Sequence, residues 1–179
     1  MNNYLEEQFL QFEQDFIRCY VPKQKELDLY IQKKKGIEDS EWLYDSFFNK
    51  AHNIALKTEV SEFINECRDI WKYWKDKPVD RDKLLDEFVD ILHFATLEFN
   101  KQGISEKSFT SIVSKVYNVN NRKNGIEQIS KLNEVDHYAD ILGISLSLII
   151  NYYGFTAEDI KNAYGNKNNE NYSRQQNGW

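Results

Sequence analysis

Residues 84–94, LLDEFVDILHF, carry the pattern that decides the fold class of this chain. Apolar residues recur there at every third or fourth position, as at Leu84, Phe88 and Ile91. An α-helix of about 3.6 residues per turn gathers such positions on one stripe. An aspartate just before the stretch can cap the start of the helix, and Gly103 can end it. The stretch therefore predicts an amphipathic helix whose apolar stripe lies in a core.

The composition of the whole chain supports a helical fold. Hydrophobic residues make up 41% of the 179 residues, which is enough for a buried core. Two prolines and seven glycines are few for the many turns of an all-β protein. The length fits one domain. We therefore expect a single all-α helical bundle that spans residues 1–179.

Further helices follow from the same periodicity and from capping residues. They are expected over residues 5–19, 22–35, 41–74, 105–120 and 126–153. A capping box of Thr156 and Asp159 begins a last helix, which we expect to end near Tyr164. The asparagine-rich sequence from about residue 165 to 179 has no apolar stripe, and its composition predicts a flexible polar tail.

Charge and cysteine content limit the classes of function. The net charge of -6 argues against a nucleic-acid-binding surface, which is normally basic. Cys19 and Cys67 are far apart in sequence, so we expect free thiols in a reducing compartment. No apolar run approaches the ~20 residues of a membrane span, and the N-terminus lacks the basic region of a signal peptide. The sequence thus predicts a cytoplasmic protein that binds neither nucleic acid nor membrane.

Two groups of carboxylates lie on neighbouring predicted helices. Glu59, Glu62 and Glu66 share one face of the first helix, and Glu87 and Asp90 share one face of the next. The connection between these helices is short and contains a proline, so the helices should pack antiparallel with their acids facing each other. Like charges that close repel strongly unless divalent cations neutralise them. Mg²⁺ prefers oxygen ligands and commonly bridges carboxylates to substrate phosphates.

Two other interpretations of these acids stay open. The acids could form a solvated helix face with surface lysines as partners. Alternatively, Asp90-x-x-His93 and Glu134-x-x-His137 have the carboxylate–histidine spacing of di-iron bundles, with Glu62 as a further ligand.

Four motifs, in order along the chain, resemble those of a known family. The E-x-x-E and E-x-x-D pairs are similar to the acidic signature of the all-α nucleoside triphosphate pyrophosphatases, the MazG-like superfamily. The sequences around them, EVSEFINECRDIWKYWKDK and LLDEFVDILHF, resemble the dimeric all-α dUTPases, as does KQKELDLYIQKKKG near the N-terminus. Residues 164–179 resemble that family's Y-x-x-K-N-x-x-N-x-x-R-Q-x-x-G-Y motif, with Trp179 in place of the final tyrosine. The resemblance covers roughly residues 22–179.

The resemblance implies a metal-dependent active site. Two or more Mg²⁺ ions would be held by four carboxylates: Glu59, Glu62, Glu87 and Asp90. These ions would bridge the triphosphate and activate a water molecule. By analogy with the family, Glu62 would be the general base, with Glu59 as its catalytic neighbour.

The resemblance also implies residues that bind the nucleotide. In the tail, Lys167, Asn171 and Arg174 match phosphate-contacting positions, and Gln175 belongs to the same motif. The tail would close over the anionic substrate and exclude water.

The base and sugar would be contacted from elsewhere in the chain. Gln24 matches the glutamine that reads uracil, for which an amide supplies both a donor and an acceptor. Asp28 falls where some members carry asparagine. Trp74 and His93 match positions near the nucleoside.

The sequence therefore predicts an Mg²⁺-dependent dUTP diphosphatase that converts dUTP to dUMP and pyrophosphate, with dUDP as a further substrate. We expect a homodimer, because the family is dimeric and the aromatic content suggests surplus apolar surface. One alternative is a related pyrophosphatase that acts on dCTP or on a broad range of dNTPs. Another is a non-catalytic helical module that binds a protein partner.

Overall fold

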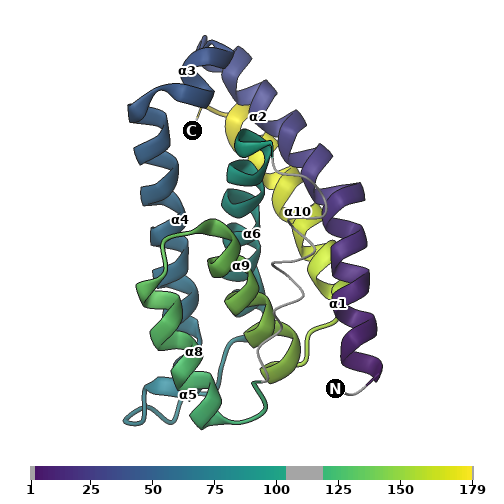
Figure 1. The fold of residues 1–179 in the computed structure, drawn as a ribbon, viewed down its shortest axis with the longest axis vertical. Coiled ribbons are helices and arrows are strands. Elements are labelled where there is room, and N and C mark those ends of the chain that lie inside the picture. The colour runs from purple at the N-terminus through teal and green to yellow at the C-terminus, as the bar shows by residue number, and fades with distance from the viewer. Residues whose placement is uncertain (1–2, 104–118, 179) are drawn as a thin grey trace.

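The computed structural model describes residues 3–103 and 119–178, and helices are the only regular elements in these two segments (Figure 1). In chain order they are α1 (Asn3–Asp15), the π-helical turn η1 (Phe16–Tyr20), α2 (Val21–Lys35), α3 (Asp39–Tyr44), α4 (Ser46–Glu66), α5 (Arg68–Trp71), α6 (Arg81–Gln102), α8 (Arg122–Glu134), α9 (Tyr138–Ser147), the π-helical turn η2 (Leu148–Tyr152) and α10 (Ala157–Gln176). The all-α prediction is confirmed. The helix expected over residues 105–120 lies almost entirely outside the described residues.

Helix α6 forms the centre of the bundle, with α4, α2, α9 and α10 packed around it (Figure 1). Its apolar stripe lies in the core as predicted, because Leu84, Phe88 and Ile91 are each 0% exposed. Asp80 caps its start by accepting a hydrogen bond from the backbone N–H of Lys83, and Gly103 ends it in the left-handed conformation, with φ 61°. The hydrophobic effect of this stripe is the main force that holds the surrounding helices in place.

Helices α4 and α6 run antiparallel, since α4 leads from α3 towards α5 and α6 returns along it (Figure 1). The single helix expected over residues 41–74 is divided into α3, α4 and α5. Asp45 is extended, with ψ 134°, and its side chain accepts a hydrogen bond from the backbone N–H of Phe47 at the start of α4. Cys67, with ψ 35°, ends α4 and separates it from α5.

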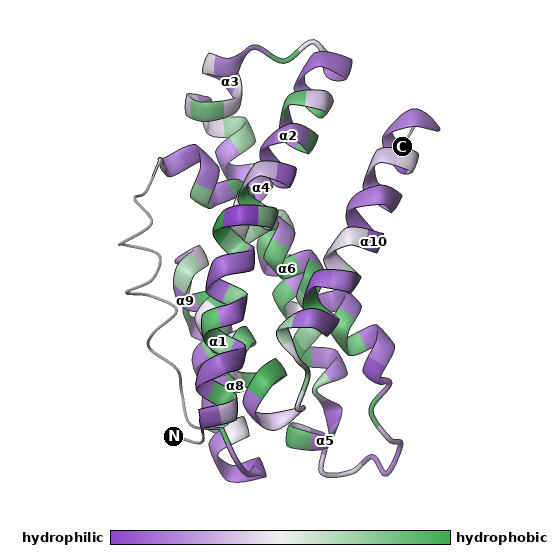
Figure 2. Ribbon diagram, turned by 90° about the vertical axis from the view of Figure 1, so that its right-hand side faces the viewer, coloured by the Kyte–Doolittle hydropathy of each residue, from purple (hydrophilic) through white to green (hydrophobic). Residues whose placement is uncertain are grey.

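The second half of the chain differs from the prediction at two places. The helix expected over residues 126–153 is interrupted between α8 and α9, where the imidazole of His137 caps the start of α9. The capping box of Thr156 and Asp159 is confirmed, but the helix that it begins continues through Gln176 where a flexible tail was expected. The far end of α10 is polar, yet Lys167 and Asn168 are buried (Figure 2). Packing on the bundle therefore outweighs the composition of the segment.

Cys19 and Cys67 are free thiols. Among the helices of the described residues, none has both the length and the apolar character that crossing a membrane requires.

Candidate active site

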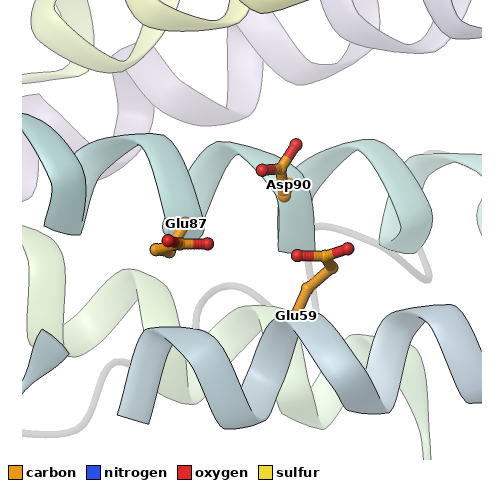
Figure 3. Close-up of side chains that lie close together, drawn as sticks. All are labelled: Glu59, Glu87 and Asp90. Carbon is orange, nitrogen blue, oxygen red and sulfur yellow. The ribbon is translucent and has the colours of Figure 1, made fainter. Parts of the chain in front are cut away.

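Three carboxylates meet between α4 and α6. Glu59 of α4 and Glu87 and Asp90 of α6 each offer one oxygen, and these oxygens all lie within 4.8 Å of one another (Figure 3). Glu87 is 6% exposed, whereas Glu59 and Asp90 are half-buried. We call these three residues the acidic cluster. Its geometry agrees with the antiparallel packing and the i, i+3 spacing that the sequence predicted.

The acidic cluster resists ionisation. Burial, followed by repulsion from the other acids, raises the pKa of Glu59 from 4.5 to about 7 and that of Glu87 from 4.5 to about 7. Burial also raises the pKa of Asp90 from 3.8 to about 6, against the opposing effect of Lys167. A divalent cation that bound here would replace these protons and offset the repulsion between the ionised carboxylates.

Glu62 lies at the edge of the cluster and Glu66 lies apart from it. Glu62 is exposed, and its charge and a hydrogen bond to Glu87 both raise the pKa of Glu87. Glu66 is buried and already paired, because Arg68 contacts it directly and Lys83 Nζ lies 3.2 Å from its carboxylate. Of these two residues, Glu62 is therefore the one placed to join the acidic cluster.

Lys167 of α10 supplies a positive charge beside the cluster. Its Nζ atom lies 2.6 Å from Asp90 Oδ2 and 2.9 Å from Asp86 Oδ2. The side chain is almost fully buried, so this ion pair is poorly screened by solvent. The expected phosphate-contacting lysine thus lies against an expected metal ligand.

A cavity of about 430 Å³ begins at the acidic cluster and extends between α2, α3, α4, α6 and α10. Most of the predicted site residues line it: Gln24, Asp28, Glu59, Asp90, His93, Asn171, Arg174 and Gln175. Glu62, Glu87 and Lys167 are not among its lining residues. The cavity therefore joins the acids to the polar residues expected to bind base and phosphates.

A chain of hydrogen bonds crosses the α2 side of the cavity. Gln24 Nε2 donates to Asp28 Oδ1 at 2.8 Å, and Gln24 Oε1 lies 2.7 Å from His93 Nδ1. Burial raises the pKa of Asp28 from 3.8 to about 7. Burial and then the charge of Lys167 lower the pKa of His93 to about 3, so its ring is neutral near pH 7.

The carboxyl end of α10 brings three predicted residues to the cavity. Asn171, Arg174 and Gln175 lie within one turn and line its wall. Arg174 is half-buried and pairs with Glu170, its neighbour one turn earlier, at 2.6 Å. Tyr172, on the same turn, packs edge-on against Tyr30 of α2, with 5.3 Å between the ring centroids. The contact between Tyr172 and Tyr30 packs this segment against α2.

Six residues of the cavity wall were not predicted as site residues: Leu27, Ile31, Trp42, His52, Phe94 and Leu97. Trp42 and His52 are the two of these from α3 and α4. Their rings meet edge to face with 4.5 Å between centroids, and both side chains are buried. The position of His52 could have been inferred, since it precedes Glu59 by seven residues and therefore lies on the same helix face. Trp42 comes from the short helix α3, which was not distinguished from α4, so no spacing argument placed it there.

Trp74 and the di-iron ligands lie elsewhere. Trp74 is 58% exposed in the loop after α5, packs against Trp71 and Tyr73, and does not line the cavity. Glu134 and His137 are exposed, and His137 caps a helix. The di-iron interpretation is therefore wrong.

A family model described as dUTPase matches residues 17–179 of the chain. Comparison with curated proteins and comparison with solved structures each gave no match.

Proposed function

Since the chain belongs to the dUTPase family, we propose that it hydrolyses dUTP to dUMP and pyrophosphate in an Mg²⁺-dependent reaction. The resemblance to dUTPases is confirmed by the family match. One observation supports the substrate and the metal dependence in this proposal. The acidic cluster is continuous with a cavity that is lined on one side by the amide of Gln24 and the carboxylate of Asp28, and on another side by α10. A nucleoside triphosphate has the same order of groups, with a base at one end and an anion at the other.

The donor set fits a hard divalent cation. Glu59, Glu87 and Asp90 offer only oxygen ligands. Burial and then repulsion from neighbouring acids raise their pKa values, and a bound cation would remove that repulsion. We propose that these three residues, with Glu62 at the edge, hold two or more Mg²⁺ ions. When bound, Mg²⁺ neutralises the phosphates and lowers the pKa of a water molecule.

The chain's own residues would then orient the substrate and move one proton. Glu62 is exposed and borders the cluster, so its carboxylate is available to accept the proton of the attacking water. Asn171 and Arg174 of α10 face the cavity and would donate hydrogen bonds to phosphate oxygens. Lys167 would exchange part of its contact with Asp90 for a phosphate oxygen. In phosphoryl transfer, such positioning and charge neutralisation supply most of the catalysis.

The base would lie at the Gln24 side of the cavity. Gln24 and Asp28 present amide and carboxylate atoms there, and Trp42 and Leu27 supply apolar walls. The cavity volume of about 430 Å³ falls within the range of small-molecule sites.

Pyrophosphate release from dUTP, dCTP, dTTP and UTP tests this proposal, each substrate being assayed with Mg²⁺ and with EDTA. We expect release from dUTP with Mg²⁺ and none with EDTA. Glu59→Gln should reduce kcat by at least a hundredfold, because it removes a carboxylate from the acidic cluster. The matched control Glu127→Gln replaces an exposed glutamate of α8 and should leave kcat unchanged. Activity that survives EDTA would rule out the metal mechanism.

A second candidate, hydrolysis of dCTP by the same residues, is favoured by one observation. Position 28 carries a carboxylate, which accepts a hydrogen bond from the 4-amino group of cytosine as readily as from N3–H of uracil. The substrate panel distinguishes the two candidates.

We also propose that the chain forms a homodimer, like the dimeric all-α dUTPases that its sequence resembles. Exposed aromatic residues on neighbouring helices support this, for example Tyr44 at 79% and Phe47 at 70% exposure. Light scattering on the purified chain measures its mass directly.

A further inference from the structure

The side-chain amide of Gln24 is held at both ends. Gln24 is 4% exposed, and its Nε2 atom donates to Asp28 Oδ1 at 2.8 Å while its Oε1 atom lies 2.7 Å from His93 Nδ1. The hydroxyl of Tyr164 adds a longer hydrogen bond to the same Oε1 atom, at 3.4 Å. An amide that lies in the open would rotate by 180° at little cost, whereas here each end has a specific partner.

Asp28 and His93 together orient the amide. The hydrogen bonds place the amino end of Gln24 at Asp28 and the carbonyl end at His93, and at pH 7.5, above the Asp28 pKa of about 7, the mostly ionised carboxylate favours this orientation because it accepts hydrogen bonds and does not donate them. A carbonyl oxygen also only accepts, so His93 must carry its proton on Nδ1. The other ring nitrogen, Nε2, is buried and has no hydrogen-bond partner in the described part of the chain. It is therefore free to be the nitrogen that lacks the proton.

The ring of His93 is itself fixed. It stacks on Tyr164 with 4.2 Å between centroids and 15° between ring planes, and the residue is 5% exposed. The imidazole therefore cannot swing away from Gln24 without disrupting the contact between α6 and α10.

We propose that His93 is a positioning residue that, together with Asp28, fixes the amide of Gln24 in one orientation and thereby sets which pyrimidine the cavity accepts. The effect on substrate selectivity rests on the proposed nucleotide hydrolysis. The fixed orientation of the Gln24 amide is inferred from the hydrogen bonds alone.

The fixed orientation matters because the two pyrimidines have opposite edges. Uracil presents the acceptor O4 beside the donor N3–H, whereas cytosine presents a donor amino group beside the acceptor N3. Gln24 and Asp28 both line the cavity, so a base in a fixed register meets one donor from the amide beside one acceptor from the carboxylate. This donor–acceptor pair is complementary to the hydrogen-bonding edge of one of the two bases and not to that of the other. A site with a defined hydrogen-bond pattern rejects the wrong partner because buried polar groups are left unpaired.

The tautomer of His93 gives a test that needs no activity. Nitrogen-15 NMR of the labelled imidazole rings distinguishes Nδ1–H from Nε2–H, and His93→Phe assigns the signal. We expect the Nδ1–H form in the wild-type protein near pH 7.5. In Asp28→Asn, whose side chain can donate as well as accept, we expect a mixture of the two forms. An Nε2–H form in the wild type, or an unchanged tautomer in Asp28→Asn, overturns the proposal.

The selectivity test uses the ratio of kcat/KM for dUTP to kcat/KM for dCTP. His93→Phe keeps a flat ring on Tyr164 but removes the N–H donor, so the preference between the two substrates should fall about tenfold. Tyr164→Phe is the matched control, because it keeps the His93 donor in place. It removes the longer hydrogen bond to Gln24 Oε1 and the hydroxyl's 3.3 Å hydrogen bond to the backbone carbonyl of Tyr20, and it should change the ratio less than twofold. His93→Gln restores a donor and should recover part of the preference.

The outcomes separate the two proposals. An unchanged ratio in a folded His93→Phe protein, or an equal loss of kcat/KM on both substrates, overturns the positioning role. If the wild type hydrolyses none of the nucleotides, the proposed function fails. In that case, titration calorimetry gives the dissociation constants of dUMP and dCMP, and their ratio measures the preference for one base. We expect this ratio to fall about tenfold in His93→Phe.

Discussion

Replacing Glu87 with glutamine should stabilise the protein in the absence of divalent cations, even though it removes a residue of the proposed active site. Glu87 has a pKa of about 7 in the folded chain against an ordinary value of 4.5. Between these two values the folded chain keeps a proton that the unfolded chain has lost. The contribution of Glu87 to the free energy of unfolding therefore decreases as the pH rises from about 4.5 through about 7, and this contribution is constant above that.

The size of the effect follows from the same two values. A change from 4.5 to about 7 corresponds to about 3 kcal/mol for an isolated group in a dry site. Solvent reaches the exposed Glu62 and part of Glu59, and the acids titrate together, so screening reduces the effect to about 1–2 kcal/mol. For a chain of this length, that raises Tm by about 3–6 °C.

Thermal unfolding of the wild type and of Glu87→Gln, followed by circular dichroism in EDTA at pH 4.5 and pH 8, measures this effect. We expect the variant to be more stable at pH 8 and nearly equal to the wild type at pH 4.5, where Glu87 is mostly protonated. Adding 10 mM Mg²⁺ at pH 8 should raise the Tm of the wild type more than that of the variant, because the ion removes the same repulsion.

Glu127→Gln is the matched control, because it removes one negative charge from an exposed position on α8. Its Tm should differ from the wild-type value by less than about 1 °C at both pH values. A Glu87→Gln protein that is less stable than the wild type at pH 8, or equally stabilised at both pH values, would refute the reasoning.

Three further substitutions test the walls of the cavity. Arg174→Ala should raise KM at least tenfold with little change in Tm, measured by steady-state kinetics and thermal unfolding, because the residue is half-buried and faces the cavity. Trp42→Phe should raise KM several-fold with kcat nearly unchanged in the same kinetic assay, because it shortens an apolar wall remote from the acids. Lys167→Met should lower the Tm at pH 8 in EDTA and enlarge the Mg²⁺-induced rise in Tm, since Asp90 loses its cationic partner. A Lys167→Met protein that is insensitive to Mg²⁺ would contradict this role.

The central part of the site could be predicted from the sequence because it depends on spacing within two long helices. Leu84, Phe88 and Ile91 define the inner face of α6, and the position of Glu87 and Asp90 relative to that face follows from 3.6 residues per turn. The connection that contains Pro78 was expected to be short and therefore predicted antiparallel packing with α4, which brings Glu59 opposite; α5 lies within this connection, and the packing is still antiparallel. Each of these steps uses local geometry, and none needs knowledge of distant parts of the chain.

Breaks within helices could not be predicted in the same way. Asp45 and Cys67 divide a stretch whose periodicity continues across them, and both are residues that also occur inside helices. The division depends on the conformation of one residue, which is set by packing on either side. Trp42 reaches the cavity only because α3 turns away from α4 at Asp45, so a residue pattern alone could not locate it.

The α10 segment shows why composition is a weaker guide than periodicity for a helix that carries polar ligands. Tyr164, Lys167 and Asn168 have the i, i+3, i+4 spacing of a buried stripe, and all three are buried. Hydrophobic periodicity does not predict this stripe, because two of its three residues are polar and a hydropathy pattern assigns polar residues to the solvent-exposed face. Burial of a lysine requires an ion-pair partner that offsets the loss of solvation. Asp86 and Asp90 of α6 are these partners for Lys167. The ion pairs of Lys167 with Asp86 and Asp90 thus help to pack α10 on α6, and Asp90 links the acidic cluster to the helix that carries Asn171 and Arg174.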